Sequence, residues 1–300
     1  MLRPDFLRKG DKIAIVSTAR KINKKAINDA VFILKKWGLV PVTGNTIGLE
    51  NHQFAGTDHE RALDFQKMLD DKEIKAIWCA RGGYGTVRII DKINFSVLQT
   101  QPKWIIGYSD ITVLHSHLHT LGICSIHALM PIDIHKNTKA SLQSLRDTLF
   151  GEKITYTIPS SRKNKKGTCK GQLVGGNLSI LYSLCGSVSS IDTSGKILCI
   201  EDLDEYLYHI DRMMQNLKRN GYFDQLAGLI VGGMTDMHDN AIPFGKKAKA
   251  IILDCVKEYD FPVVFKFPMG HVDDNSALIM GVEASLEILE NKVILSYLTD

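Results

Sequence analysis

The first half of the chain alternates short apolar runs with longer segments in which apolar residues recur every three or four positions. Short apolar runs are typical of buried strands, and the longer periodic segments are typical of amphipathic helices. The pattern predicts strands at residues 13–16, 39–42, 74–79 and 104–106, and helices at 24–37, 58–69 (opened by an aspartate cap), 86–93 and 111–121. This alternation predicts a parallel sheet with helices on both faces, in which ligands bind beyond the carboxyl ends of the strands.

The pattern changes after residue 150. Residues 151–171 are polar, basic and interrupted by glycines, which indicates a connector or an irregular first element of a second domain. Beyond them the sequence predicts a helix that ends near residue 184, strands at 197–200, 229–231 and 263–267, helices at 207–220 and 246–259, and a hairpin of 286–289 with 293–296. We therefore predict two α/β domains, residues 1–155 and 171–300, joined by a linker at 156–170.

Composition and charge narrow the class of protein. The 300 residues are 44% hydrophobic with a formal net charge of +4, which is typical of a globular chain with a large core. A short basic run at residues 162–166 predicts a solvated loop rather than a nucleic-acid-binding surface. No apolar run reaches the roughly 20 residues that span a bilayer, and the N-terminus lacks the apolar stretch of a leader peptide. Dispersed cysteines without C-x-x-C spacing indicate free thiols in a reducing compartment, so we expect a cytoplasmic protein without a nucleic-acid or membrane partner.

Residues 103–112 carry the clearest chemical signal. A buried-type strand runs into a small-residue turn, presents Ser109, and a helix follows at once. A serine on such a turn projects its hydroxyl from the carboxyl end of a sheet, where the N–H groups of the following helix point at a developing oxyanion. The segment departs from the hydrolase motif G-x-S-x-G, because Ile111 stands where the second glycine would be. An ordinary strand-to-helix turn with a helix cap is the alternative.

The glycine-rich sequence Arg81-Gly82-Gly83-Tyr84-Gly85 follows the predicted strand 74–79. Its glycines let the backbone approach a ligand closely and leave N–H groups free to bind it. It lacks the Gly-Lys-Ser/Thr ending and the G-x-G-x-x-G spacing of nucleotide sites, so we expect no nucleotide and no other cofactor. A flexible turn is the alternative.

Two further candidates stand at strand ends in the second half. Glu201 follows the strand 197–200, where a carboxylate can orient another side chain, although the surrounding acidic cluster also suits a helix cap. His271 follows the strand 263–267, and a lone loop histidine is usually only a polar surface residue. His271 becomes a candidate only together with Ser109 and Glu201, because a serine nucleophile needs a base and the base needs an orienting group.

Other constellations are weaker. His115 and His119 share a helix face, but no glutamate stands in the H-E-x-x-H position between them, and Asp133 and His135 are weak additional ligands, so we expect no metal. Cys79 precedes the glycine loop but ends a buried strand, which disfavours it as a nucleophile.

In these segments the chain resembles the LD-carboxypeptidases of the muramoyltetrapeptide carboxypeptidase type, a family of serine peptidases that also contains the microcin-C self-immunity peptidases. The resemblance covers nearly the whole length, and the order and spacing of the segments make it specific. The segments that carry it are residues 7–17, Arg81-Gly82-Gly83-Tyr84-Gly85, Gly107-Tyr108-Ser109-Asp110-Ile111-Thr112, Gly175-Gly176-Asn177-Leu178, residues 198–202, and Gly270-His271 with Asn275.

The resemblance implies Ser109 as the nucleophile, Glu201 as the orienting acid and His271 as the general base. It maps the oxyanion hole onto backbone N–H groups near Gly83 and of Asp110. The implied fold is a flavodoxin-like N-terminal domain with a smaller swivelling β/β/α C-terminal domain, and the active site lies at their junction. The family also suggests a homodimer.

The implied activity is metal-independent release of the terminal D-alanine from cytoplasmic muropeptide tetrapeptides, as in cell-wall recycling. A carboxypeptidase must hold a terminal carboxylate, so Arg81 is a possible clamp, and Gly82 and Tyr84 complete the predicted substrate-binding set. Two rivals remain open. One is a microcin-C-type peptidase that hydrolyses a peptidyl-nucleotide, with Phe150 or Tyr156 as its aromatic platform, and the other is a non-catalytic module that binds cell-wall fragments.

Two stretches depart from the family pattern. Residues 278–281 read Leu-Ile-Met-Gly where the family commonly has a Leu-Pro-x-Gly-like segment. Residues 127–131 read His-Ala-Leu-Met-Pro where the family has a His-Gly-Pro-like stretch. Neither departure removes a catalytic group, but both affect the expected shape of the substrate pocket.

Overall fold

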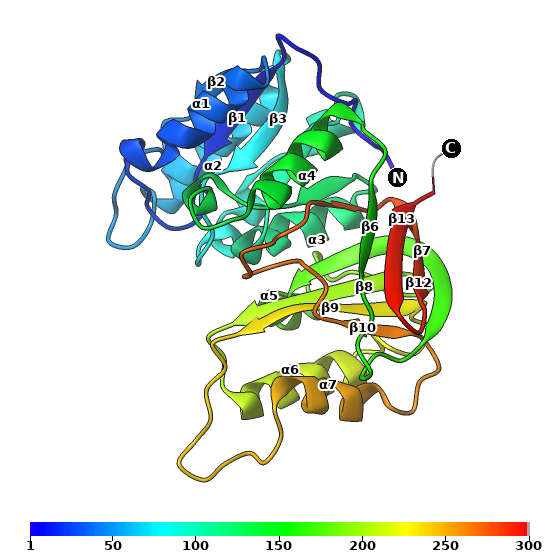
Figure 1. The fold of residues 1–300 in the computed structure, drawn as a ribbon. Helices are drawn as coiled ribbons and strands as arrows, with labels where there is room; N and C mark the ends of the chain where they lie inside the picture. The colour runs from blue at the N-terminus through cyan, green and yellow to red at the C-terminus, as the bar shows by residue number, and fades with distance from the viewer. Residues whose placement is uncertain (299–300) are drawn as a thin grey trace.

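The computed structural model describes residues 1–298, which form two packed units, each built on one sheet (Figure 1). The first sheet has the strand order β2-β1-β3-β4-β5-β11. Its strands are β1 Lys12–Val16, β2 Val40–Thr43, β3 Ile74–Cys79, β4 Trp104–Gly107, β5 Ser125–His127 and β11 Leu278–Met280. The first five strands are parallel in the order typical of flavodoxin-like folds, and β11 adds an antiparallel edge. The predicted flavodoxin-like parallel sheet is therefore confirmed.

Helices cover both faces of this sheet because its strands are apolar on both sides. Ile13 and Ile15 of β1 pack in one cluster with α1 Asn28–Lys36 and α4 Lys139–Phe150. The intervening Ala14 and the following Val16 pack on the other face, with α2 Asp58–Asp70 and α3 Thr112–Thr120. Short 3-10 turns lie between these elements: η1 Lys24–Ile27, η2 Thr86–Arg88, η3 Ile90–Lys92, η4 Ser96–Gln99, η5 Ser109–Ile111 and η6 Pro131–Asp133.

The second sheet has the strand order β10-β9-β8-β7-β12-β13-β6. Its strands are β6 Thr155–Pro159, β7 Gly167–Asn177, β8 Ile197–Leu203, β9 Gly228–Thr235, β10 Val263–Phe265, β12 Glu283–Ile288 and β13 Lys292–Tyr297. β7 to β10 are parallel, whereas β12, β13 and β6 are antiparallel. α5 Leu178–Leu184 follows β7, and α6 Leu207–Arg219 packs beside α7 Ala248–Val256 against one face of the sheet (Figure 1). The predicted mixed α/β second half with its terminal hairpin is confirmed.

Several local predictions are wrong. Residues 151–171, predicted as a connector or an irregular first element of a second domain, instead contain the regular strand β6 and the first part of β7. In both strands partly buried residues alternate with exposed ones, a strand pattern that the polar composition hid. The helix predicted at 86–93 is two 3-10 turns, η2 and η3. α2 is capped by Thr57 rather than Asp58: Glu60 N donates to Thr57 Oγ1 (3.2 Å), and Thr57 N donates to Glu60 Oε2 (2.7 Å).

The domain division at residues 1–155, 156–170 and 171–300 stays a prediction, and its last two residues lie outside the described part. β11 comes from the second half of the chain but pairs with β5 in the first sheet. No helix within residues 1–298 combines the length and the apolar character that crossing a bilayer would require.

The two sheets meet near the carboxyl ends of β4 and β7. The backbone N–H of Asn177, the last residue of β7, donates to Thr112 Oγ1 at the start of α3 (2.9 Å). Gly176 approaches Thr112 so closely that a Cβ there would clash with its side chain. The strand ends that carry the candidate residues of both halves therefore lie at the junction of the two units.

Candidate active site

Ser109 stands on a strained turn between β4 and α3. Its φ is +63°, in the left-handed region that serine rarely adopts, and its side chain is almost completely buried. Gly107 makes the turn possible with a φ of +158°, because a Cβ there would lie 2.8 Å from Ile111 Cγ1. The turn matches the predicted geometry of a serine held at a strand-to-helix elbow.

The glycine loop lies directly against this turn. A Cβ built on Gly82 would lie 3.2 Å from Ser109 Oγ and 3.4 Å from the backbone nitrogen of Asp110. Gly83 has a φ of +107°, which glycine adopts without strain. Within residues 1–298 the N–H groups of Gly83 and Asp110 donate no hydrogen bond to the protein, so both are available to an oxyanion.

Two buried groups hold this loop in place. The fully buried Arg61 donates from Nη1 to Gly85 O (2.9 Å) and to Thr18 O (2.6 Å). Thr86 N donates to Asp110 Oδ2 (2.8 Å), which joins the end of the loop to the residue after Ser109. These hydrogen bonds hold the end of the loop against the turn that carries Ser109.

The fully buried Glu201 and the partly buried His271 form a hydrogen-bonded pair in the second unit. His271 Nδ1 donates to Glu201 Oε2 (2.7 Å), and the backbone N–H of His271 donates to the same oxygen (3.1 Å). Glu201 lies within β8 and is fully buried, so it is not the exposed helix cap of the alternative interpretation. Gly270 (φ +88°) packs on the Glu201 carboxylate with no room for a Cβ, and its N–H donates to Asn275 Oδ1 (2.9 Å).

The electrostatics of the pair suit a general base with a charged partner. Burial opposes ionisation of Glu201, but the neighbouring His271 outweighs it and holds the pKa of the carboxyl below its usual value. Burial likewise lowers the pKa of His271, but the Glu201 carboxylate raises it more, so the net pKa is above the usual value. The imidazolium that forms when His271 accepts a proton is therefore stabilised in place.

Tyr108 connects the two halves of the site. Its ring packs against the His271 imidazole, with 4.8 Å between ring centroids, and it precedes Ser109 in the chain. Its hydroxyl donates to Asp133 Oδ2 (3.0 Å), and burial raises the pKa of both groups. The imidazole therefore lies next to the turn that carries Ser109. Within residues 1–298 the Ser109 hydroxyl makes no hydrogen bond to His271 or to any other group.

Other supporting residues were not found from the sequence. Asn177 Nδ2 donates to Asp202 Oδ1 (2.9 Å) and reaches Glu201 Oε1 (3.4 Å), so it supports the side of the carboxylate that His271 does not use. Burial, with Glu201 nearby, raises the pKa of Asp202 to about 7. Asn177 belongs to the segment Gly175-Gly176-Asn177-Leu178, which carries the family resemblance, and Asp202 follows Glu201 directly. For both residues, this position in the sequence was the only signal of a supporting role. Tyr108 was likewise indicated only by its position next to Ser109. Nothing in the sequence indicated that Arg61 supports the glycine loop.

The remaining candidates are placed as follows. Arg81 Nη1 donates to Lys21 O (3.1 Å), and Tyr84 is 45% exposed beside Phe54. Both ring nitrogens of His115 are used, one with Ser125 Oγ (2.8 Å) and one with Gly107 O (2.9 Å), so this histidine has no nitrogen free for a metal. Burial raises the pKa of the Cys79 thiol, which opposes its use as a nucleophile.

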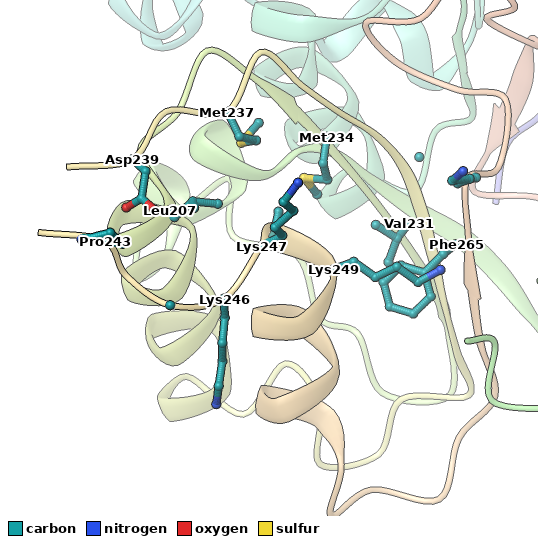
Figure 2. A pocket seen from close by; sticks show the side chains of 14 residues that line it. Leu207, Val231, Met234, Met237, Asp239, Pro243, Lys246, Lys247, Lys249 and Phe265 are labelled. Carbon is teal, nitrogen blue, oxygen red and sulfur yellow. The ribbon is translucent and has the colours of Figure 1, made fainter. Parts of the chain in front are cut away.

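A cavity of about 640 Å³ lies apart from this site, where β9 and β10 meet the start of α7 (Figure 2). Met234, Lys247 and Phe265 line it, and Lys249 Nζ lies 4.3 Å from the centre of the Phe265 ring. None of the predicted site residues lines this cavity.

Comparison with known proteins gives a consistent result. Residues 13–128 match the family model described as the LD-carboxypeptidase N-terminal domain, and residues 170–286 match the LD-carboxypeptidase C-terminal domain. A probable murein peptide carboxypeptidase of Bacillus subtilis is 37% identical over 98% of this chain and 94% of its own length. A murein tetrapeptide carboxypeptidase of Pseudomonas aeruginosa is 29% identical over 92% of this chain and 93% of its own. The crystal structure of a muramoyltetrapeptide carboxypeptidase from Oxalobacter formigenes superposes with a TM-score of 0.87 and 25% identity, covering 95% of this chain and 98% of that one.

Proposed function

This chain belongs to the LD-carboxypeptidase family, and from that premise we propose that it removes the terminal D-alanine from muropeptide tetrapeptides by a Ser109–His271–Glu201 mechanism. The observation that carries the proposal is the hydrogen-bonded Glu201–His271 pair, whose imidazole packs against Tyr108, the neighbour of the strained Ser109. The proposed setting is recycling of cell-wall fragments in the cytoplasm. The homodimer that the family suggests stays a prediction.

In the proposed reaction Ser109 Oγ attacks the carbonyl carbon of the last peptide bond. His271 Nε2 accepts the serine proton, and Glu201 stabilises the resulting imidazolium through Nδ1–H. The carbonyl oxygen becomes an oxyanion and accepts hydrogen bonds from the Gly83 and Asp110 N–H groups. One such donor typically contributes about 3–4 kcal/mol to transition-state stabilisation.

Collapse of the tetrahedral intermediate breaks the C–N bond. His271 returns its proton to the leaving amine, which departs as D-alanine, and the peptide remains esterified to Ser109. A water molecule then attacks the ester carbonyl while His271 accepts its proton. Transfer of that proton to Ser109 Oγ releases the shortened peptide and restores the enzyme.

Three loop residues, Arg81, Gly82 and Tyr84, remain proposed substrate contacts. The aromatic platform of the microcin-C-type rival gains no support, because its two side chains are engaged elsewhere. Tyr156 donates its hydroxyl to Ala277 O and packs edge-on against Phe267, and Phe150 lies under the Arg146 guanidinium.

The test is release of D-alanine from a defined tetrapeptide by the wild-type protein and by Ser109→Ala. We expect Ser109→Ala to fold normally and to lose about a million-fold in kcat. The matched control is Ser183→Ala on α5, an exposed serine whose hydroxyl donates only to Ile180 O (2.8 Å); it should retain full activity. EDTA should leave turnover unchanged. Tetrapeptide trimming by Ser109→Ala, or a loss with EDTA that zinc restores, would contradict the proposal.

A further inference from the structure

We propose that Arg20, not Arg81, binds the terminal carboxylate of the substrate, an inference that rests on the proposed function. A carboxypeptidase acts only on the last peptide bond, and a cation that pairs with the free carboxylate enforces that choice. Sequence reasoning directed this role to Arg81 because that residue opens the glycine loop. The contacts of the two arginines differ in a way that reverses the assignment.

Arg20 is built onto the predicted oxyanion hole. A Cβ on Gly83 would lie 2.5 Å from Arg20 Cδ and 3.1 Å from its Nε, so the arginine stem covers Gly83 directly. The backbone is fixed as well: Arg20 N donates to Gly82 O (3.4 Å), and Arg20 O accepts from Ser17 Oγ (2.7 Å). The start of the side chain is therefore held at the loop that lies over Ser109.

The guanidinium of Arg20 is free to bind a ligand. The residue is exposed, and within residues 1–298 its side chain donates no hydrogen bond and forms no salt bridge. The neighbouring arginines each have a partner within the protein. Arg61 and Arg88 both pair with Asp58, and Arg81 donates to Lys21 O. The charge of Arg81 also acts on Asp133, the acceptor of the Tyr108 hydroxyl, where it lowers the pKa of the carboxyl against the larger opposing effect of burial.

The chemistry of the substrate places its carboxylate within reach of this group. The carbon of the terminal carboxylate is three bonds from the scissile carbonyl carbon, a distance of at most about 3.7 Å. When the scissile oxygen accepts from Gly83 and Asp110, the carboxylate lies beside the loop that Arg20 covers. A guanidinium presents two parallel N–H groups, and a terminal carboxylate accepts both through its two oxygens as a charged pair. An uncharged peptide amide at the same position cannot form that pair. Arg20 would thus determine exopeptidase specificity.

The experiment compares binding of a tetrapeptide and of its C-terminal amide to protein that cannot turn them over. Calorimetry on Ser109→Ala should show the acid binding about 30- to 100-fold tighter than the amide, as expected for loss of a charge-assisted bidentate contact. Adding Arg20→Ala should bring the two affinities to within about 3-fold of each other, chiefly by weakening the acid. Arg20→Lys should retain an intermediate preference, because lysine keeps the charge but not the paired geometry.

Lys21→Ala is the matched control. It removes the adjacent, partly exposed cation, whose Nζ pairs with Glu50 (2.9 Å), and should leave the acid preference intact. A preference that survives Arg20→Ala, or one that Arg81→Ala abolishes instead, overturns the inference while the proposed hydrolase function stands. If Ser109→Ala retains turnover, the proposed function fails on its own. If Ser109→Ala binds neither peptide, both fail. Melting temperatures within about 2 °C of each other show that the variants remain folded.

Discussion

The two halves of the candidate site are built by different means. In the first unit the backbone does the positioning: Ser109 and Gly83 adopt positive φ angles, and the available groups are N–H donors. In the second unit the charges of the side chains do the positioning, because Glu201 is fully buried and its negative charge is stabilised by His271. The first half thus depends on conformations that few residue types can adopt, and the second depends on an ion pair that neither partner can lose alone.

Of the changes that separate the two halves, the one in the charged half has the largest expected effect. Glu201→Gln keeps the size of the side chain but removes the charge that stabilises the imidazolium. We expect kcat for D-alanine release to fall by about 10,000-fold, with KM changed much less. Steady-state kinetics on the tetrapeptide measure both constants. Retention of more than a tenth of the wild-type kcat would show that the carboxylate does not serve His271.

A smaller effect is expected from breaking the backbone half. Gly83→Ala puts an alanine at a φ of +107°, which strains the loop backbone and turns its N–H, and the Arg20 side chain must move away from the new methyl group. We expect kcat to fall by about 100- to 1,000-fold, the usual consequence of losing one oxyanion donor.

Gly122→Ala provides the comparison for that loss. Gly122 also has a positive φ, of +75°, but no atom lies within 4 Å of the position its Cβ would take. The variant therefore also places an alanine at a positive φ but leaves the glycine loop undisturbed, and its kcat should match the wild type. Equal losses in the two variants would assign the Gly83 effect to general destabilisation.

The smallest effect is a shift of the pH profile. Burial lowers the pKa of His271, and Glu201, with smaller contributions from Asp202 and Asp133, raises it above 6.5 overall. Because the base must be neutral, kcat/KM should fall with decreasing pH and reach half of its plateau above pH 6.5.

Without the Glu201 charge, burial is less opposed and the pKa of His271 drops. The residual activity of Glu201→Gln should therefore have its midpoint at lower pH than the wild type. A pH series of kcat/KM on both proteins measures the shift, and a midpoint that stays unchanged or rises contradicts the assigned pairing.

Much of this arrangement could be predicted from the sequence, because local patterns carried it. Apolar runs located β1, β3 and β4 within one or two residues, and the strand-end rule placed Ser109, Glu201 and His271 at candidate positions. The family resemblance then supplied their roles. Each of these signals lies within a few consecutive residues.

The rest depends on contacts between distant segments. β5 and β11 have three residues each, too few for any periodic signal, and pair only because the fold brings them together. Arg61 holds the glycine loop from α2, and Tyr108 meets His271 across the junction. The Arg20 contact with Gly83 likewise joins residues that are 63 positions apart. Such contacts leave no mark on the composition around either partner.

The strand β11 has a consequence for how the molecule can be divided. The loop that carries His271 leaves from β10 in one sheet and enters β11 in the other, so the imidazole is tethered at both ends to different bodies. A recombinant fragment that stops before residue 278 would expose the bare edge of β5 and invite aggregation. Reassembling an active protein from two separately expressed pieces would therefore succeed only when the break spares the stretch from 263 to 280.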